Sequence, residues 1–258
     1  MSKLLVKLKY NGTNYVGWQV QKNGLSVQEC VQDAIEKLYG VRTDVTGCSR
    51  TDSGVHANGY CFCFKPPYPV EPYKAVAALN FALPDDMGVC GCMSVPDDFH
   101  PRYNAVAKEY IYKIYDGRPR NPFLCGLAYH YIGKLDTGLM NAAAREFVGK
   151  HDFKSFMANG SKIRDTVRTV YYCDVSDKDE YIQVRICADG FLYKMVRIIV
   201  GTLIAVSEQK IDKNQISYII SARDRSAAGK TASPSGLYLN KVFYDLKEVE
   251  NAGAGTEI

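Results

Sequence analysis

The first ten residues alternate between apolar and polar side chains, as in a β-strand with one buried face. Leu4, Val6, Leu8 and Tyr10 occupy every second position, and lysines fill two of the positions between them. This period of two predicts a half-buried strand, and the Asn-Gly pair that follows predicts the turn that ends it.

A helix is predicted after this strand, over residues 27–39. Ser26 and Glu29 have the spacing of a capping box, in which the two side chains satisfy backbone amides at a helix start. Apolar residues then recur with the helical period up to Gly40, a residue type that commonly follows a helix. An aromatic strand over residues 60–64 and a helix with Pro72 in its first turn complete this half of the chain.

The same order of elements recurs about a hundred residues later. A strand is predicted over residues 110–115 and ends at Asp116-Gly117; Asp136 caps a helix that runs to Gly149, and another strand follows around residues 181–186. We therefore expect an α+β fold of two related modules, residues 1–105 and 106–250, each a mainly antiparallel sheet with helices on one face. Residues 251–258 have no periodic pattern and are expected to be a disordered tail.

Composition narrows the class of protein. The 258 residues are 47% hydrophobic, enough for a sizeable core, and no apolar run reaches the ~18 residues of a membrane span. The first residues lack the apolar segment of a signal peptide, so we expect a cytoplasmic protein with no membrane association. The odd number of cysteines, nine, argues against a disulfide framework. Cys61-x-Cys63 and Cys90-x-Cys92 are spaced more closely than zinc ligands usually are, so no metal site is expected.

The charge is compatible with a nucleic-acid partner only if it is concentrated on one surface. The net charge is +4 and the isoelectric point 8.4, below the value of about 9 that marks a strongly nucleic-acid-binding domain. Between residues 145 and 168, six basic residues face three acidic ones. Nineteen tyrosines offer flat faces on which bases can stack, although most such residues in a protein serve packing.

The segment from Cys48 to Ala57 is the most informative part of the chain. It places Arg50 and Asp52 two positions apart in a short polar stretch between Gly47 and Gly54. Glycines allow tight turns, and loops on a rigid scaffold often carry catalytic groups. The alternative is that Asp52 is an ordinary turn aspartate that bonds to its own backbone.

Arg197 is the single charged residue in the apolar stretch 195–206. An arginine is rarely buried without a partner, and its guanidinium cannot lose its proton. Arg197 is therefore expected either to extend to solvent or to pair with a carboxylate and hold it ionised, and Asp52 is the attractive partner. The residues alone point to a carboxylate–arginine site with aromatic neighbours and do not choose a reaction.

Several motifs follow one another in a single order from residue 4 to about 246. The central one is Arg50-Thr51-Asp52-x-Gly54-Val55-His56-Ala57. The others are Tyr10-x-Gly12-Thr13-x-Tyr15-x-Gly17-Trp18-Gln19, Asn23-Gly24-x-Ser26-Val27-Gln28, Phe99-His100-x-Arg102, Lys108-x-Tyr110-x-Tyr112, His151-Asp152-Phe153-x-Ser155-Phe156, Met195-Val196-Arg197-x-Ile199-Val200-Gly201 and Gly236-Leu237-Tyr238-Leu239. In this order, the motifs resemble those of the tRNA pseudouridine synthase A family.

The resemblance implies a pseudouridine synthase fold with the active-site cleft between the modules. It implies that the protein isomerises uridine to pseudouridine in the anticodon stem-loop of tRNA, at positions 38–40, without a cofactor and as a homodimer. Asp52 would be the nucleophile and Arg197 its ion-pair partner. Tyr110 would stack on the target uracil, Arg50 would help to extrude the nucleotide, and Leu237 would pack against the flipped base.

Basic residues are expected to contact RNA phosphates. The candidates are Arg118, Arg120, Lys150, Lys154, Lys162, Arg164 and Arg168. The chain departs from the family pattern at Cys48, Ser49 and Ser53, where the family commonly has Ala, Gly and Ala, and Ser49 adds a side chain beside the proposed catalytic turn.

Two other functions were weighed. Asp52-Ser53-Gly54 and Asp136-Thr137-Gly138 are D-[ST]-G triplets, as in aspartic proteases, whose chemistry needs two carboxylates that share a proton. Helix capping accounts for Asp136 more simply. The second alternative is an RNA-binding module without catalytic activity.

Overall fold

The computed structural model describes residues 2–117 and 119–254, which form two compact units. The first unit comprises Met1–Val106 and Tyr238–Tyr244, and the second comprises Ala107–Leu237 and Asp245–Ile258. The division after Val106 lies next to the module boundary that the sequence suggested. Tyr238–Tyr244, assigned to the second module from the sequence, belongs to the first unit because it pairs in parallel with the strand that begins at His56.

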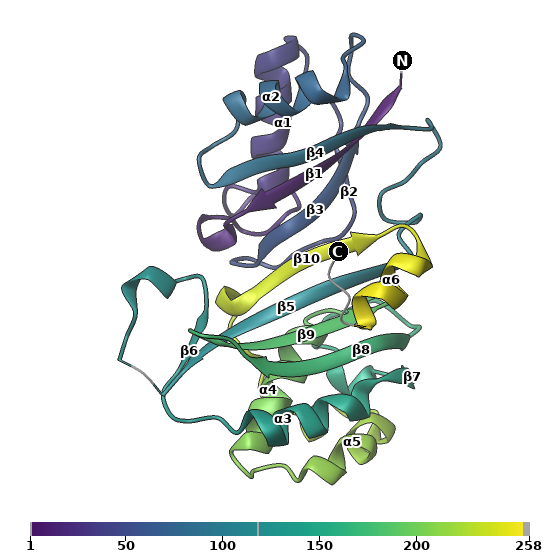
Figure 1. Ribbon diagram of the computed structural model, residues 1–258. Helices are drawn as coiled ribbons and strands as arrows, with labels where there is room; N and C mark the ends of the chain where they lie inside the picture. Colours follow the sequence, from purple (N-terminus) through teal and green to yellow (C-terminus); the bar gives the residue numbers. More distant parts are fainter. Residues whose placement is uncertain (1, 118, 255–258) are drawn as a thin grey trace. The chain divides into compact units, whose positions relative to one another are not determined.

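The first unit is built on a mainly antiparallel sheet with the strand order β4-β1-β3-β10, and β2 pairs with β3. The helices α1 and α2 both lie on the same side of β1, β3 and β4 (Figure 1). The bounds of these elements are β1 Lys3–Tyr10, α1 Val27–Tyr39, β2 Thr46–Gly47, β3 His56–Phe64, α2 Pro72–Ala82, β4 Met87–Val95 and β10 Leu237–Phe243.

Alternation along β1 fixes the core of this unit. Val6 lies opposite Phe62 and Leu8 opposite Tyr60, and all four side chains are fully buried. The predicted cap of α1 is present, since the Ser26 side chain accepts a hydrogen bond from the Glu29 amide at 3.2 Å. The predicted first strand and first helix are therefore confirmed.

The second unit has an antiparallel sheet of order β5-β9-β8-β7, and the short β6 pairs in parallel with β5. Helix α3 packs against β8 and against α4. The bounds are β5 Ala107–Asp116, β6 Tyr129–Tyr131, α3 Thr137–Ala144, β7 Gly149–Asp152, β8 Val167–Asp177, β9 Ile182–Ala188, α4 Met195–Ser207, α5 Ile216–Ala222 and α6 Leu246–Gly253. Single turns of 3₁₀ helix cover Gly12–Asn14, Pro122–Leu124, Arg145–Phe147, Lys154–Phe156, Lys213–Gln215, Arg225–Ala227 and Pro234–Gly236.

The strand–helix–strand order predicted for the second half is confirmed, with a shorter helix. Asp136 caps α3, because its side chain accepts a hydrogen bond from the Leu139 amide at 2.9 Å. The helix tightens into a 3₁₀ turn after Ala144, and Gly149, with φ of 114°, opens β7. The sequence analysis named neither β8 nor α5.

The expected disorder from Asn251 is wrong for residues 251–253, which form the end of α6. This helix is held to the sheet of the second unit: Arg185 on β9 donates to the Ala252 carbonyl at 3.1 Å, and Gly253 packs on the Tyr172 ring. The sequence window was too short to show a contact with strands more than sixty residues away. Residues 255–258 of the predicted tail lie outside the described residues.

Within the described residues, none of the helices has the length and hydropathy that crossing a membrane would require. Cys61 and Cys63 lie buried on β3, whereas Cys90 on β4 is exposed. No group of three or more His, Cys, Asp or Glu side chains in the described part of the chain has the arrangement of a metal site.

Candidate active site

Asp52 lies on the loop that connects β2 to β3 in the first unit. The amide of Val55 donates to the Asp52 carbonyl at 3.2 Å and closes a turn, and Gly54 adopts a φ of 75°. The turn character expected of Asp52 is thus present in its backbone. The Gly54 amide donates to the Tyr15 carbonyl at 3.2 Å, so the turn is tied to a second segment of the same unit.

That second segment, residues 12–18, holds the Asp52 loop by direct backbone contact. A methyl group added at Gly17, which has φ of 101°, would lie 2.2 Å from the Thr51 carbonyl oxygen. One added at Gly12 would lie 2.0 Å from the Val55 carbonyl oxygen. Only glycine permits so close an approach of two backbones. These contacts explain why two separate sequence motifs are needed to build one loop.

Aromatic side chains also hold the loop in place. Trp18 stacks on Tyr60 with ring centroids 4.0 Å apart, and the Tyr60 hydroxyl donates to the Ser49 carbonyl. The Tyr10 hydroxyl and the Thr51 hydroxyl are hydrogen-bonded at 3.0 Å. Both hydrogen bonds reach a residue within three positions of Asp52, so the loop is pre-formed.

His56 fixes the far end of the loop. It is fully buried, its Nδ1 accepts a hydrogen bond from the Gly12 amide at 3.0 Å, and its ring stacks on Tyr238 at 4.5 Å. Because Nδ1 accepts this bond, it carries no proton. His56 thereby joins the loop both to residue 12 and to the start of strand β10.

Arg50 is exposed on the same loop as Asp52 and borders a surface pocket of about 240 Å³ in the first unit. Arg102 also lines this pocket, and its guanidinium lies 5.8 Å from the centre of the exposed Tyr103 ring. Ser49, one of the three departures from the family pattern, is part of the pocket wall. The sequence analysis had quoted Arg102 in a motif without giving it a role.

Tyr110 and Leu237 belong to the second unit, and both side chains are largely buried. The ring of Tyr110 on β5 meets Phe191 edge-on at 4.9 Å. Leu237 follows Gly236, where an added methyl group would lie 2.5 Å from the Lys113 carbonyl oxygen. The glycine of the Gly236-Leu237 motif therefore lets the chain approach β5 directly.

Arg197 lies half-buried near the start of α4 in the second unit. Its Nε donates to the Ala232 carbonyl at 2.8 Å, and the Ala232 amide donates to the Arg197 carbonyl at 3.0 Å. Burial raises the pKa of the neighbouring Tyr112, and the positive charge of Arg197 opposes that rise. This half-burial does not distinguish extension to solvent from pairing with a carboxylate, so both expectations stand.

Residues 229–232, which include the hydrogen-bond partner of Arg197, pack closely against α4. A methyl group at Gly201 would lie 1.6 Å from the Lys230 carbonyl oxygen, and the buried Thr202 hydroxyl accepts a hydrogen bond from the Gly229 amide at 2.9 Å. The glycine of the Met195 to Gly201 motif thus serves the packing that positions Arg197.

Two of the predicted site residues, Asp52 and Arg50, share one loop of the first unit, while Tyr110, Arg197 and Leu237 lie in the second. The predicted ion pair between Asp52 and Arg197 would join the two units, and it stays a prediction.

The predicted phosphate contacts differ in their surroundings. Arg168 is half-buried, and its Nη1 donates to the Asp165 and Val167 carbonyls, so it braces its own strand. Arg118 lies outside the described residues. The exposed candidates are Arg120, Lys150, Lys154, Lys162 and Arg164.

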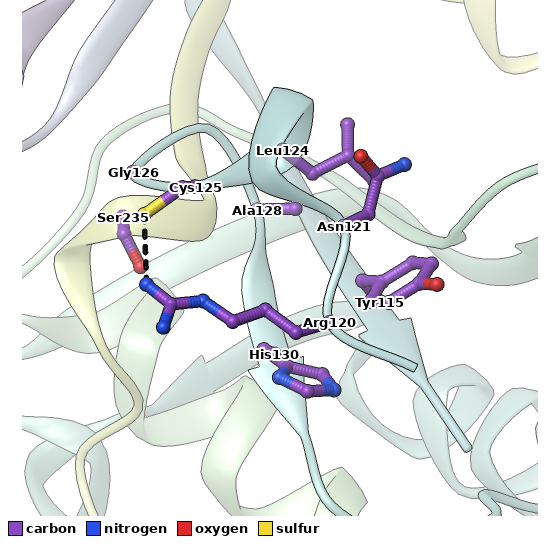
Figure 2. A pocket seen from close by; sticks show the side chains of 9 residues that line it. All are labelled: Tyr115, Arg120, Asn121, Leu124, Cys125, Gly126, Ala128, His130 and Ser235. Atoms are coloured by element: carbon purple, nitrogen blue, oxygen red, sulfur yellow. Dashed lines mark hydrogen bonds between the residues drawn. The ribbon is translucent and has the colours of Figure 1, made fainter. Parts of the chain in front are cut away.

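A second pocket, of about 260 Å³, opens in the second unit and was not anticipated (Figure 2). It is lined by Tyr115, Arg120, Asn121, Leu124, Cys125, Gly126, Ala128, His130 and Ser235. Most of these residues come from the segment between β5 and β6, which has no periodic pattern, so only Arg120 had been singled out from the sequence.

Comparison with known proteins points to one family. The family model described as tRNA pseudouridine synthase matches residues 8–104 and 143–245. The chain is 43% identical over 245 residues to the tRNA pseudouridine synthase A of Ruminiclostridium cellulolyticum, covering 95% of this chain and 100% of that protein. It is 42% identical over 244 residues to the protein of the same name from Clostridium acetobutylicum, with the same coverage.

Among solved structures, a chain from a "Crystal Structure of a Cbf5-Nop10-Gar1 Complex" covers 98% of this chain and 66% of its own length, at 12% identity and a TM-score of 0.34. So low a TM-score carries no weight for function. The family model and the full-length relatives suffice: the chain belongs to the tRNA pseudouridine synthase family of isomerases.

Proposed function

We propose that this protein converts uridine to pseudouridine in the anticodon stem-loop of tRNA, with Asp52 as the nucleophile and no cofactor. The observation that carries the proposal is the pre-formed Asp52 loop, clamped through Gly12 and Gly17, in a chain that matches the family over both halves. A loop that loses its conformational entropy during folding presents its carboxylate without rearrangement when RNA binds.

The reaction is an isomerisation that balances without an oxidant or a second substrate. The bond between ribose C1′ and uracil N1 breaks, a bond between C1′ and C5 forms, the proton at C5 is lost, and N1 gains a proton. A carboxylate can assist either by covalent attack or by stabilising positive charge at C1′. Attack at C1′ and attack at uracil C6 are both compatible with this role for Asp52.

The other site residues are assigned to handling the target nucleotide. A stacked base must leave its helix before reaction, at a cost of about a few kcal/mol. Arg50, exposed on the catalytic loop, would enter the space that the extruded nucleotide vacates. Tyr110 would stack on the uracil, Leu237 would pack against it, and Arg197 would pair with Asp52. We further propose that a homodimer binds the tRNA.

The test is incubation of the purified protein with unmodified tRNA, followed by mapping of pseudouridine at each position. We expect product in the anticodon stem-loop without added metal or nucleotide. Asp52→Ala and Asp52→Asn should form no product while retaining the tRNA dissociation constant of the wild type. Absence of product from the wild-type protein would falsify the proposal.

Two controls separate the alternatives. An RNA-binding module without catalysis predicts that Asp52→Ala changes nothing measurable. Asp136→Ala should remain fully active, because Asp136 caps α3. Loss of activity in Asp136→Ala at an unchanged melting temperature would instead favour a two-aspartate mechanism.

A further inference from the structure

Ring contacts and hydrogen bonds hold the wall of the pocket of about 260 Å³ in the second unit. Tyr115 on β5 lies opposite His130 on β6, and their rings are 5.3 Å apart. The Tyr115 hydroxyl donates to the Pro119 carbonyl at 2.7 Å, and the buried Asp116 side chain accepts the Leu135 amide at 3.0 Å. The first bond holds the start of the segment that forms most of the pocket, and the second holds the chain beyond β6 to the end of β5.

The polar groups of the wall suit an anion. Arg120 contributes a guanidinium, His130 an imidazole, Asn121 an amide and Ser235 a hydroxyl, and none of the nine described lining residues is acidic. Arg120 extends across the pocket toward Ser235 and Cys125 (Figure 2), and its Nη2 lies 3.9 Å from the Cys125 sulfur, a weak acceptor. A guanidinium bonds far more strongly to a phosphate, in a paired geometry.

The pocket lies close in the chain to residues assigned to the target base. Ser235 precedes Leu237 by two positions, and Tyr115 lies five positions beyond Tyr110 on β5. At the rise of a strand those five residues span about 17 Å. A base that stacks on Tyr110 would therefore lie out of reach of Tyr115.

We propose that this pocket is an RNA subsite that takes one nucleotide outside the target uridine, with Arg120 on its phosphate and the Tyr115–His130 ring pair against its base. This proposal rests on the proposed function, since it assumes an RNA substrate. RNA-binding proteins commonly combine basic groups on the backbone with aromatic rings on unpaired bases. The pocket would fix the register of the RNA while the Asp52 loop acts on it.

Cys125 gives a direct probe of the pocket. Its thiol is exposed and lines the wall, while Cys90, exposed on β4 of the first unit, provides an internal control. We expect saturating tRNA to slow alkylation of Cys125 by iodoacetamide at least fivefold and to leave Cys90 unchanged, as measured by peptide mass spectrometry. Parallel arms use inorganic phosphate and uridine monophosphate in place of tRNA.

Substitution of Arg120 tests the phosphate contact. Arg120→Ala should lower kcat/KM about tenfold, mainly through KM, and reduce the salt dependence of tRNA binding by about one phosphate contact. Arg120→Lys should restore part of the affinity. Lys178→Ala, which removes another exposed positive charge of the same unit outside the pocket, should behave as wild type.

The outcomes separate this proposal from the proposed function. Equal alkylation of Cys125 with and without tRNA, together with wild-type kinetics of Arg120→Ala, would overturn the subsite while pseudouridine formation still stood. Protection without any pseudouridine formed would support the subsite and overturn the proposed function. Protection by uridine monophosphate or phosphate but not by tRNA would show a small-anion site and overturn the RNA assignment.

Discussion

At the scale of single residues, the site depends on glycines as much as on charged groups. Gly12 and Gly17 carry no chemistry, yet their missing side chains let residues 12–18 touch the backbone of the Asp52 loop. Gly201 and Gly236 do the same for the segments that present Arg197 and Leu237. In this chain, the segments that carry the proposed site residues are held by backbone contacts that only glycine allows.

Gly17→Ala adds only one methyl group, yet it should strongly lower the stability of the protein and distort the Asp52 loop. A Cβ at this position meets the Thr51 carbonyl, and φ of 101° is unfavourable for alanine, so we expect a loss of roughly 3 kcal/mol in unfolding free energy. Pseudouridine formation should fall further than the folded fraction does. Urea unfolding and single-turnover assays at low temperature measure the two effects.

Gly40→Ala is the matched control for Gly17→Ala. Gly40 also has a positive φ, 71°, but nothing lies within 4 Å of an added methyl group. It should cost only about 1–2 kcal/mol of conformational strain and leave the activity of the folded protein intact. Equal effects of the two substitutions on activity would show that contact with Thr51 is unimportant.

At the scale of elements, one helix and one loop form a unit that positions Arg197. The Thr202 hydroxyl on α4 donates to the Ile198 carbonyl and accepts from the Gly229 amide, and both partners are buried with it. Three residues further on, Ala232 exchanges two hydrogen bonds with Arg197. Helix α4 thus fixes the loop through two of its residues, Arg197 and Thr202.

Thr202→Val keeps the shape of the side chain and removes its hydroxyl. The Gly229 amide would lose its partner in a buried site, so we expect a loss of about 1–3 kcal/mol in unfolding free energy. Ser221→Ala removes a hydroxyl whose bond is exposed and local, and should cost much less. A melting temperature of Thr202→Val equal to that of Ser221→Ala would contradict this account.

At the scale of the whole molecule, the burial of each cysteine determines how reactive its thiol should be. Among the nine thiols, Cys90 and Cys125 are exposed, and Cys92 is intermediate. Burial raises the pKa of Cys61 and of Cys92 to about 11, and that of Cys187 to about 12. Because the thiolate is the reactive form, these three thiols should be inert near neutral pH.

Alkylation of the native protein at pH 8 should therefore label two thiols rapidly, Cys90 and Cys125. The buried thiols should react only in urea, or as the pH approaches their raised pKa values, since the thiolate fraction rises with pH. Mass spectrometry of peptides from native and unfolded samples counts the labelled sites. Rapid labelling of Cys61 or Cys187 in the folded protein would show that the sheet opens locally.

Local patterns in the sequence predicted several elements well, because their causes are local. The alternation in residues 4–10 and the caps at Ser26 and Asp136 act within a few positions, and all are present in the structure. The end of α6 was expected to be disordered because the residues that hold it, Arg185 and Tyr172, are far away in the chain.

The sequence by itself determined the family, the α+β class and the loop on which Asp52 and Arg50 lie, because these depend on residue type and local spacing. Tertiary structure decided which segments hold that loop, that β10 joins the first unit, and that Tyr115, Arg120, His130 and Ser235 form one pocket. Such features depend on contacts between segments that are far apart in the chain. The residue pattern within any single segment does not specify which other segment it will contact.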